Sequence, residues 1–179
     1  MKTEIATLAN GCFWCTEAIF NRLKGVKSVL PGYSGGKTDN PSYDEVCTGR
    51  TDHAEAAQIE FDPTVMSFEK LLNVFWHTHD PTTLNRQGTD VGTQYRSAIF
   101  YHDEKQRESA EKSRRDLENR GVYKDPIVTE ITPLKKFYVA EGYHKRYYDQ
   151  NQDAPYCRFV IDPKIRKLVN QYGKDLKDE

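Results

Sequence analysis

The chain has 179 residues, and its 26 basic and 27 acidic side chains leave a net charge of −1 at pH 7. Such a balance supplies no field for holding nucleic acid or an anionic membrane, so neither is expected as a partner. Hydrophobic residues at 37% and aromatic residues at 12% exclude a disordered chain. The length predicts one catalytic domain over residues 1–179, and we expect it to be a monomer.

The N-terminal stretch lacks the apolar core of a secretory signal, and no window approaches the ~20 apolar residues of a membrane span. A cytoplasmic protein is therefore expected. Thiols stay reduced in that compartment, so the cysteines should be reactive, metal-bound or buried rather than paired in disulfides. There are four of them, at Cys12, Cys15, Cys47 and Cys157.

The first half of the chain alternates strands and helices. Strands are predicted over 4–9, 26–33 and 56–61 from their apolar pattern, and a helix over 16–24 from its helical spacing. The Gly- and Pro-rich stretch from Gly32 to Pro41 predicts a loop. Ser67 is a predicted helix N-cap, because apolar residues follow at helical spacing from Phe68 to Trp76.

In the second half, a long loop over 80–94 precedes a strand over 97–101 and a charged surface helix over 103–120. A strand over 127–131 and helices over 141–150 and 163–176 complete the prediction. The order from residue 4 to 101 is strand, helix, strand, strand, helix, strand, which matches the split βαβ arrangement. We predict an α+β fold, a two-layer α/β sandwich with a ferredoxin-like split βαβ core and added helices and long loops.

Cys12 falls where the first predicted strand gives way to the first helix. Unpaired backbone N–H groups and the positive end of the helix dipole should lie beside its sulfur, and both favour the thiolate. Gly11 allows the sharp turn before it. Cys12 is therefore a candidate nucleophile.

The Cys12-x-x-Cys15 spacing has three interpretations: a redox dithiol, half of a zinc site, or a pair of buried structural cysteines. Zinc would need two further ligands. The available candidates are His77 with His79, or Cys47 with His53, and neither pair has a usual zinc spacing. The redox interpretation is favoured and no metal is expected.

Several ordered motifs carry a resemblance to a known family. They are Gly11-Cys12-Phe13-Trp14, Gly32-Tyr33-Ser34-Gly35-Gly36, Pro41-Ser42-Tyr43-Asp44-Glu45-Val46, His53-Ala54-Glu55, Asp90-Val91-Gly92-Thr93-Gln94-Tyr95-Arg96-Ser97, Glu141-Gly142-Tyr143-His144 and Pro155-Tyr156-Cys157. Together they resemble the peptide methionine sulfoxide reductases of type A over most of the chain.

The resemblance implies an oxidoreductase that repairs oxidatively damaged proteins by reducing the S epimer of methionine sulfoxide, free or in proteins. No cofactor is implied. The thiolate of Cys12 would attack the sulfoxide sulfur and become a sulfenic acid, while methionine leaves. A second thiol and thioredoxin, or another thiol reductant, would then restore the enzyme.

The resemblance also implies roles for other residues. Glu55 matches an acid that protonates the sulfoxide oxygen, and Tyr43 and Tyr95 match phenols that hydrogen-bond the same oxygen. Asp90 matches a residue that holds the polar network of the pocket. Phe13 and Trp14 match the apolar wall that receives the substrate methyl group.

Two departures from the family pattern matter. Many members carry recycling cysteines in a Gly-rich C-terminal tail, whereas residues 172–179 contain none. Cys15 and Cys47 are therefore equal candidates for the resolving thiol, with Cys157 or an external thiol behind them. Asp52 stands where the family usually has glycine, and we expect its carboxylate to shift the backbone or raise the pKa of Glu55.

Two alternatives from other classes stay open at this point. One is a thioredoxin-like dithiol oxidoreductase that uses Cys12 and Cys15, although no partner proline loop is evident. The other is a non-enzymatic redox-sensing or zinc-binding module built on the same cysteines and the histidines.

Overall fold

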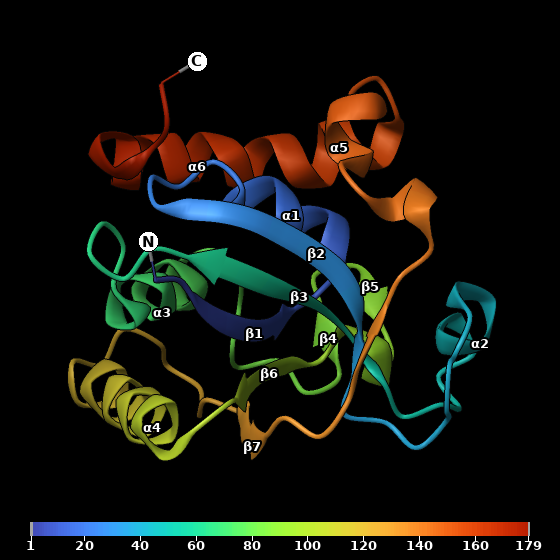
Figure 1. Cartoon of the computed structure of the whole chain (residues 1–179), viewed down its shortest axis with the longest axis horizontal. Helices are drawn as coiled ribbons and strands as arrows, with labels where there is room; N and C mark the ends of the chain where they lie inside the picture. Colours follow the sequence, from blue (N-terminus) through green and yellow to red (C-terminus); the bar gives the residue numbers. More distant parts are fainter. Residues whose placement is uncertain (1, 179) are drawn as a thin grey trace.

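A computed structural model describes residues 2–178 and is built around a six-stranded sheet (Figure 1). Neighbouring strands run antiparallel, apart from the parallel pair β6 and β7. A separate two-stranded hairpin lies beside it. In spatial order the sheet contains β7 (Glu130–Pro133), β6 (Ser97–Tyr101), β1 (Glu4–Asn10), β3 (Ala54–Phe61), β2 (Val26–Ser34) and β8 (Phe137–Val139), and the hairpin contains β4 (Arg86–Gln87) and β5 (Asp90–Val91).

Helices surround the sheet and carry much of the remaining chain. The α-helices are α1 (Phe13–Phe20), α2 (Tyr43–Cys47), α3 (Phe68–His77), α4 (Glu104–Asn119), α5 (Tyr147–Gln150) and α6 (Asp162–Tyr172). Single turns are formed by η1 (Thr93–Tyr95), η2 (Gly142–His144), the π-helical η3 (Cys157–Ile161) and η4 (Gly173–Asp175). The combination of a mainly antiparallel sheet with these helices confirms the predicted α+β class. Within residues 2–178, no helix has the length and apolarity needed to cross a membrane.

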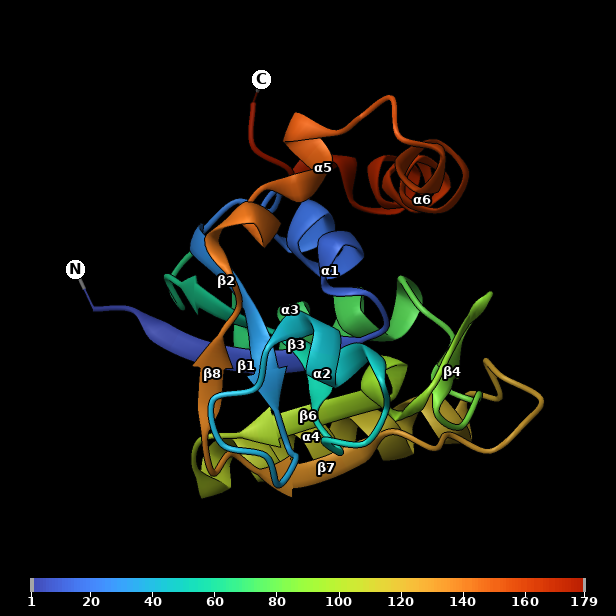
Figure 2. The same cartoon turned by 90° about the vertical axis from the view of Figure 1, so that its right-hand side faces the viewer.

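The main hydrophobic core lies between one face of the sheet and four helices. Alternate residues of β1 and β3, such as Leu8 and Ile59, meet Ile19 of α1 and Phe75 of α3, and α4 and α6 close the same core. Helix α1 contacts β2, β3 and α6, and it lies between the sheet and α6 (Figures 1 and 2). Met66 is part of this core, with 2% of its surface exposed.

The opposite face of the sheet is lined by small residues. Ala9, Ala56 and Ala98 form a second cluster with Phe100, and Phe137 packs against it. Leu134, in the segment that leads into β8, also packs against this cluster.

Most predicted elements of the core are confirmed, with shifted ends. Strand β6 has the predicted bounds. Ser67 caps α3 by accepting a hydrogen bond from the Lys70 amide at 3.1 Å. Helix α1 begins at Phe13, earlier than predicted, because Cys12 is already its N-cap.

Other predictions were wrong in detail. The predicted helix over 141–150 is broken into η2 and α5, since Arg146 adopts a left-handed conformation with φ of 55°. Strand β7 begins three residues after the start of the predicted strand over 127–131. Strand β8, helix α2 and the β4–β5 hairpin were not predicted, because each is too short to show a periodic pattern.

The contact between β2 and β8 gives a first testable prediction. A Cβ added at Gly32 would lie 2.4 Å from the Tyr138 carbonyl oxygen and 2.3 Å from Cζ of Phe137. We expect Gly32→Ala to lower the free energy of unfolding by about 1–3 kcal/mol, because β8 must move off the sheet edge. Chemical denaturation measures this, with Gly173→Ala as the control, since its Cβ would meet nothing within 4 Å. Equal losses in both variants would contradict the prediction.

Candidate active site

Cys12 lies at the junction between β1 and α1, as predicted. It is the N-cap residue of α1, and its carbonyl oxygen accepts hydrogen bonds from the amides of Cys15 and Thr16 at 3.0 and 3.3 Å. Gly11 before it has a φ of +107°, a conformation that favours glycine. The Cys12 side chain is buried, with 7% exposed.

Cys12 and Cys15 lie together in one buried cluster. In the resting structure burial raises the pKa of Cys12, and the contacts with Cys15 and the charge of Glu55 raise it further. Conversely, the hydrogen bond from Cys12 lowers the pKa of Cys15 to about 7, against the effect of burial. The sequence-based expectation that the helix start favours a Cys12 thiolate is therefore wrong for the resting pair, because desolvation outweighs the helix dipole.

Glu55 projects from β3 towards the start of α1. One carboxyl oxygen, Oε1, accepts a hydrogen bond from the Phe13 amide at 3.1 Å, while Oε2 is buried without a partner in the protein. Only 1% of the residue is exposed. Burial raises the pKa of Glu55 to about 8, although the Phe13 amide opposes this, and the charge of Asp90 adds to the rise. At neutral pH Glu55 is thus a protonated acid beside Cys12.

Tyr43 and Tyr95 are brought to the same place from separate elements. Tyr43 begins α2, whose capping box is formed by Ser42 and Glu45, and Tyr95 ends η1. For both phenols burial is the main cause of a raised pKa, and the charge of Glu55 is the next. Both therefore remain hydrogen-bond donors throughout the neutral range.

Asp90 connects to the thiol pair through a residue that sequence reasoning missed. The Tyr156 hydroxyl donates to Oδ2 of Asp90 at 2.6 Å and lies 3.8 Å from the Cys15 sulfur. Tyr156 was visible within a family motif, but nothing in the sequence distinguished its hydroxyl from that of a packing tyrosine.

Phe13 and Trp14 differ in exposure, since the first is buried and the second is half-buried. Phe13 is fully buried and packs against Tyr33, 5.7 Å between ring centroids. The Trp14 ring stacks on Tyr147 at 3.7 Å with an interplanar angle of 8°. Its indole N–H donates to Nδ1 of His144 at 3.0 Å. Trp14 is thus the accessible part of the predicted wall, and Phe13 supports it from within the core.

Glu141 is a second residue that the sequence analysis did not select. Its carboxylate accepts hydrogen bonds from the Tyr33 hydroxyl and from the Tyr43 amide, both at 2.9 Å. These bonds tie the start of α2 to the segment between β8 and η2. Tyr43 is held in place by this connection.

The remaining cysteines occupy different surroundings. Cys47 is exposed at the end of α2, whereas Cys157 is buried in one cluster with Cys12 and Cys15. Asp52 has a φ of 62°, a conformation in which glycine is favoured, and its carboxylate pairs with Lys37 at 3.2 Å. Asp52 therefore keeps the glycine-like backbone and points its charge to the surface.

No group of three or more His, Cys, Asp or Glu residues within the described chain, residues 2–178, has a geometry that could hold a metal ion. His53 and His79, two of the candidate ligands, instead bond neighbouring protein groups through both ring nitrogens. The zinc interpretation has no ligand set in these residues.

The assembled site contains two buried thiols, a protonated carboxyl group and two phenols whose pKa values are raised by burial and by the charge of that carboxyl group. A thiol beside an acid can attack an electrophilic atom while the leaving or accepting oxygen is protonated. This arrangement defines a thiol-dependent enzyme.

Comparison with known proteins places this site in a family. A family model described as Peptide methionine sulfoxide reductase matches residues 4–177. The chain is 54% identical over 169 residues to Peptide methionine sulfoxide reductase MsrA of Sulfolobus acidocaldarius, covering 94% of this chain and 95% of that protein. It is also 54% identical over 177 residues to MsrA of Thermus thermophilus, covering 99% of each.

Solved structures agree. The reduced form of Mxr1 from Saccharomyces cerevisiae superposes with a TM-score of 0.79 at 38% identity, covering 87% of this chain and 90% of that one. Mxr1 in complex with Trx2 gives 0.56 at 26% identity, covering 82% and 85%. The chain belongs to the peptide methionine sulfoxide reductase family. The resemblance seen in the motifs is confirmed, and the family assignment replaces the thioredoxin-like and non-enzymatic alternatives.

Proposed function

We propose that the protein is a peptide-methionine (S)-S-oxide reductase that acts as a single catalytic domain, with Cys12 as its nucleophile. One observation carries this proposal beyond family membership: Glu55, with a pKa of about 8, is a buried proton donor next to Cys12 and has a free oxygen, Oε2. A sulfoxide is a weak electrophile until its oxygen is protonated, and this carboxyl group supplies that proton.

The first chemical step uses the thiol pair and the acid together. The Cys15 thiolate takes the proton of Cys12 as the Cys12 sulfur attacks the sulfoxide sulfur, and Glu55 protonates the sulfoxide oxygen. Oxygen is then transferred as hydroxyl to Cys12, the sulfide leaves as methionine, and Cys12 becomes a sulfenic acid. Tyr43 and Tyr95 donate hydrogen bonds to the oxygen as its charge changes.

Substrate binding relies on the aromatic side of the site. Trp14, backed by the buried Phe13, provides a flat apolar surface for the methyl group of methionine sulfoxide. Because the acid and the phenols fix the oxygen, a fixed methyl site allows only one sulfur configuration, which supports selection of one epimer. The test is turnover of the separated S and R epimers of methionine sulfoxide, free and in a peptide. Equal rates for both would overturn the proposal.

Of the two predicted resolving thiols, the geometry favours Cys15 over Cys47. Cys15 lies in the same buried cluster as Cys12, whereas Cys47 is exposed on α2. Attack of the Cys15 sulfur on the Cys12 sulfenic acid forms a disulfide and releases water. Asp90 supports this step through Tyr156, whose hydroxyl lies by the Cys15 sulfur.

The resolving step is tested by mass spectrometry after one equivalent of methionine sulfoxide. We expect a Cys12–Cys15 disulfide in the wild type, and a persistent sulfenic acid at Cys12 in Cys15→Ser, because the other candidate, Cys47, is exposed on α2. Cys47→Ser serves as the matched control and should keep the disulfide. A disulfide that vanishes in Cys47→Ser and remains in Cys15→Ser would transfer the role to Cys47.

A thioredoxin-type protein completes the cycle in this proposal. The complex of the similar protein Mxr1 with Trx2 supports such a partner. The reductant's two thiols would reduce the Cys12–Cys15 disulfide by thiol–disulfide exchange and become a disulfide themselves. We propose the cytoplasm as the compartment, where thiols stay reduced.

The finer description of the fold is also proposed. The four central strands follow the order β6, β1, β3, β2 and are all antiparallel, with α1 and α3 as crossovers. This order supports a ferredoxin-like split βαβ core. We further propose that the domain works as a monomer.

A further inference from the structure

Glu17 is a buried carboxyl group that the mechanism above does not use. It lies on α1, about one helical turn beyond Trp14, and only 3% of it is exposed. Its Oε1 accepts a hydrogen bond of 2.6 Å from the backbone amide of Arg146, which is 129 residues away in sequence. Burial raises the pKa of Glu17 to about 7, and the Arg146 amide counteracts this shift. A buried acid whose hydrogen-bond partner is the main chain of a distant segment requires an explanation.

The backbone at this contact has an unusual conformation. Arg146 adopts φ of 55° and ψ of 35°, in the left-handed region that side-chain-bearing residues rarely enter. Its own side chain points elsewhere and pairs with Asp149 at 2.8 Å. The interaction with Glu17 is therefore made by the main chain, and it compensates for a backbone conformation that costs about 1 kcal/mol or more.

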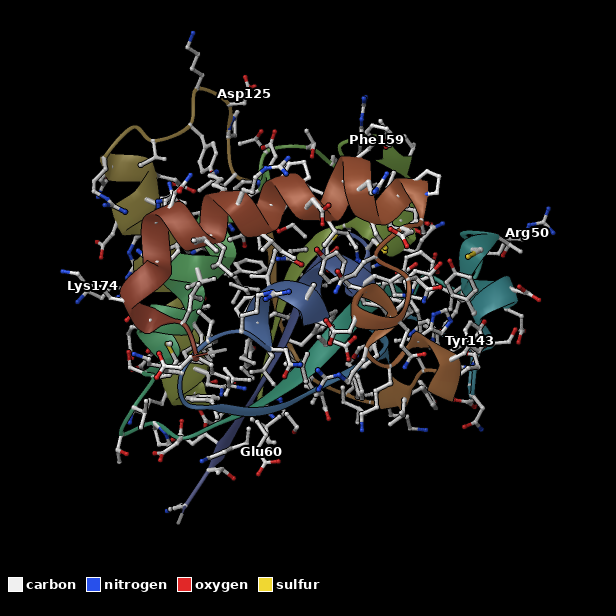
Figure 3. The ribbon with its side chains drawn as sticks, turned by 90° about the horizontal axis from the view of Figure 1, so that it is seen from above. Arg50, Glu60, Asp125, Tyr143, Phe159 and Lys174 are labelled. Atoms are coloured by element: carbon white, nitrogen blue, oxygen red, sulfur yellow. The ribbon has the colours of Figure 1, made fainter. Side chains whose placement is uncertain are left out.

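Two aromatic residues flank the left-handed turn and meet Trp14. Tyr147, directly after Arg146, stacks on the Trp14 indole, and His144, two residues before Arg146, accepts the indole N–H. We call His144 and Tyr147 the aromatic frame of Trp14. Figure 3 shows the segment that carries this frame lying beside α1, with Tyr143 directed outwards.

The segment also packs against α1, since Tyr148 lies in one buried cluster with Ala18. A pocket of about 240 Å³ adjoins this contact and is lined by Ala18 and Asn21 on the α1 side and by Arg146 and Tyr148 on the other. The hydrogen bond from the Arg146 amide to Glu17 adds a contact of defined direction to this packing.

We propose that Glu17 is a positioning residue, whose carboxyl group holds the turn at Arg146 against α1 and thereby fixes the aromatic frame of Trp14. This deepens the proposed function and rests on it, because Trp14 is the surface assigned to the substrate methyl group. Loss of the contact frees the frame to move, so the apolar wall is less well formed when substrate arrives. The chemistry at Cys12 and Glu55 is left intact.

The test compares Glu17→Leu, which removes the acceptor at similar size, with Glu17→Gln, whose amide oxygen can accept the same bond. We expect Glu17→Leu to raise KM for methionine sulfoxide about ten-fold with kcat changed less than about two-fold. Glu17→Gln should restore the wild-type KM. Asp149→Ala is the matched control, because it removes the ion pair of the Arg146 side chain and leaves the main-chain contact.

Acrylamide quenching of tryptophan fluorescence measures how well the aromatic frame shields Trp14, and it needs no assay of activity. Trp76 is 1% exposed and contributes little, so quenching follows Trp14. Quenching should increase in Glu17→Leu and stay at the wild-type level in Glu17→Gln and Asp149→Ala. A wild-type protein that reduced no sulfoxide would contradict the proposed function. The quenching measurement would still decide whether Glu17 positions the aromatic frame.

Unchanged quenching and KM in Glu17→Leu would overturn the inference, as would a loss confined to kcat. Amide hydrogen exchange covers the case in which Glu17→Leu does not fold. The Arg146 amide of the wild type should exchange slowly because it is bonded to Glu17, and rapid exchange there would reject the contact.

Discussion

Replacement of Cys12 by serine is expected to reduce methionine sulfoxide turnover at least about 10³-fold, to the background of the assay. The serine hydroxyl is a far weaker nucleophile than a thiolate, and it cannot form the sulfenic acid through which oxygen is removed. Because the side chain is small and sits at the helix N-cap, where serine is a preferred residue, the fold should be retained. Steady-state turnover of the S epimer measures the effect.

Two controls separate loss of the nucleophile from general damage. Circular dichroism and thermal unfolding of Cys12→Ser should match the wild type to within a few degrees. Cys157→Ser removes another buried thiol of the same cluster and should keep the first turnover, which mass spectrometry detects as one equivalent of methionine. Full activity in Cys12→Ser would remove Cys12 from the mechanism and leave Cys15 as the nucleophile.

The second large effect is expected from Glu55→Gln. The amide can donate a hydrogen bond but cannot deliver a proton, so kcat/KM should fall by about 10²–10⁴. In the wild type the acid form is needed, and it is lost as the pH rises through about 8. The Cys15 thiolate speeds the attack by taking the proton of Cys12, and this thiolate appears as the pH rises through about 7. The wild-type pH profile should be a narrow bell between these values.

The pH profiles of variants test which residue causes each limb of the wild-type profile. Glu55→Gln should lose the descending limb near pH 8, and Cys15→Ser should lose the ascending limb near pH 7. Glu108→Gln, on the exposed side of α4, is the control and should leave both limbs in place. A descending limb that persists in Glu55→Gln would show that another group is the acid.

Glu55→Gln, which lowers turnover, is expected to raise the stability of the fold at alkaline pH. The pKa of Glu55 is raised from 4.5 to about 8 on folding, so folding favours the protonated form. The stabilisation that comes from this pKa shift is fully present below about pH 4.5 and is lost as the pH rises through about 8. Since glutamine carries no charge, Glu55→Gln should be more stable than the wild type at pH 9, by a few kcal/mol to order of magnitude. Denaturation curves at pH 5 and pH 9 measure the difference.

Sequence periodicity was enough to place the main elements of the sheet and its helices. The apolar spacing after Ser67 predicted α3, and the turn at Gly11 predicted the position of Cys12. Strand β8 and helix α2 escaped prediction because their three and five residues are stabilised by partners distant in sequence. The break in the predicted helix at Arg146 was also not visible in the sequence, since the backbone amide there bonds to Glu17, 129 residues away.

For the site, the motifs identified the residues but not their pKa values or their hydrogen bonds in the folded chain. Cys12 and Glu55 are 43 positions apart, and pairing of β1 with β3 brings their strands together. The pKa of Cys12 was predicted in the wrong direction because burial and the Cys15 contact exist only in the folded chain. Tyr156 and Glu141 were missed for a related reason: their importance lies in hydrogen bonds that no local pattern reveals.

The burial of Met66 has a consequence for an enzyme that encounters oxidants. The chain has two methionines, Met1 and Met66, and the thioether of Met66 is enclosed between the sheet and its helices. An oxidant must reach sulfur to convert it to a sulfoxide, and a polar sulfoxide would disrupt an apolar core. By keeping this sulfur out of reach, the fold preserves its own integrity under the conditions that generate its substrate. A repair enzyme built in this way seldom needs repair at that position.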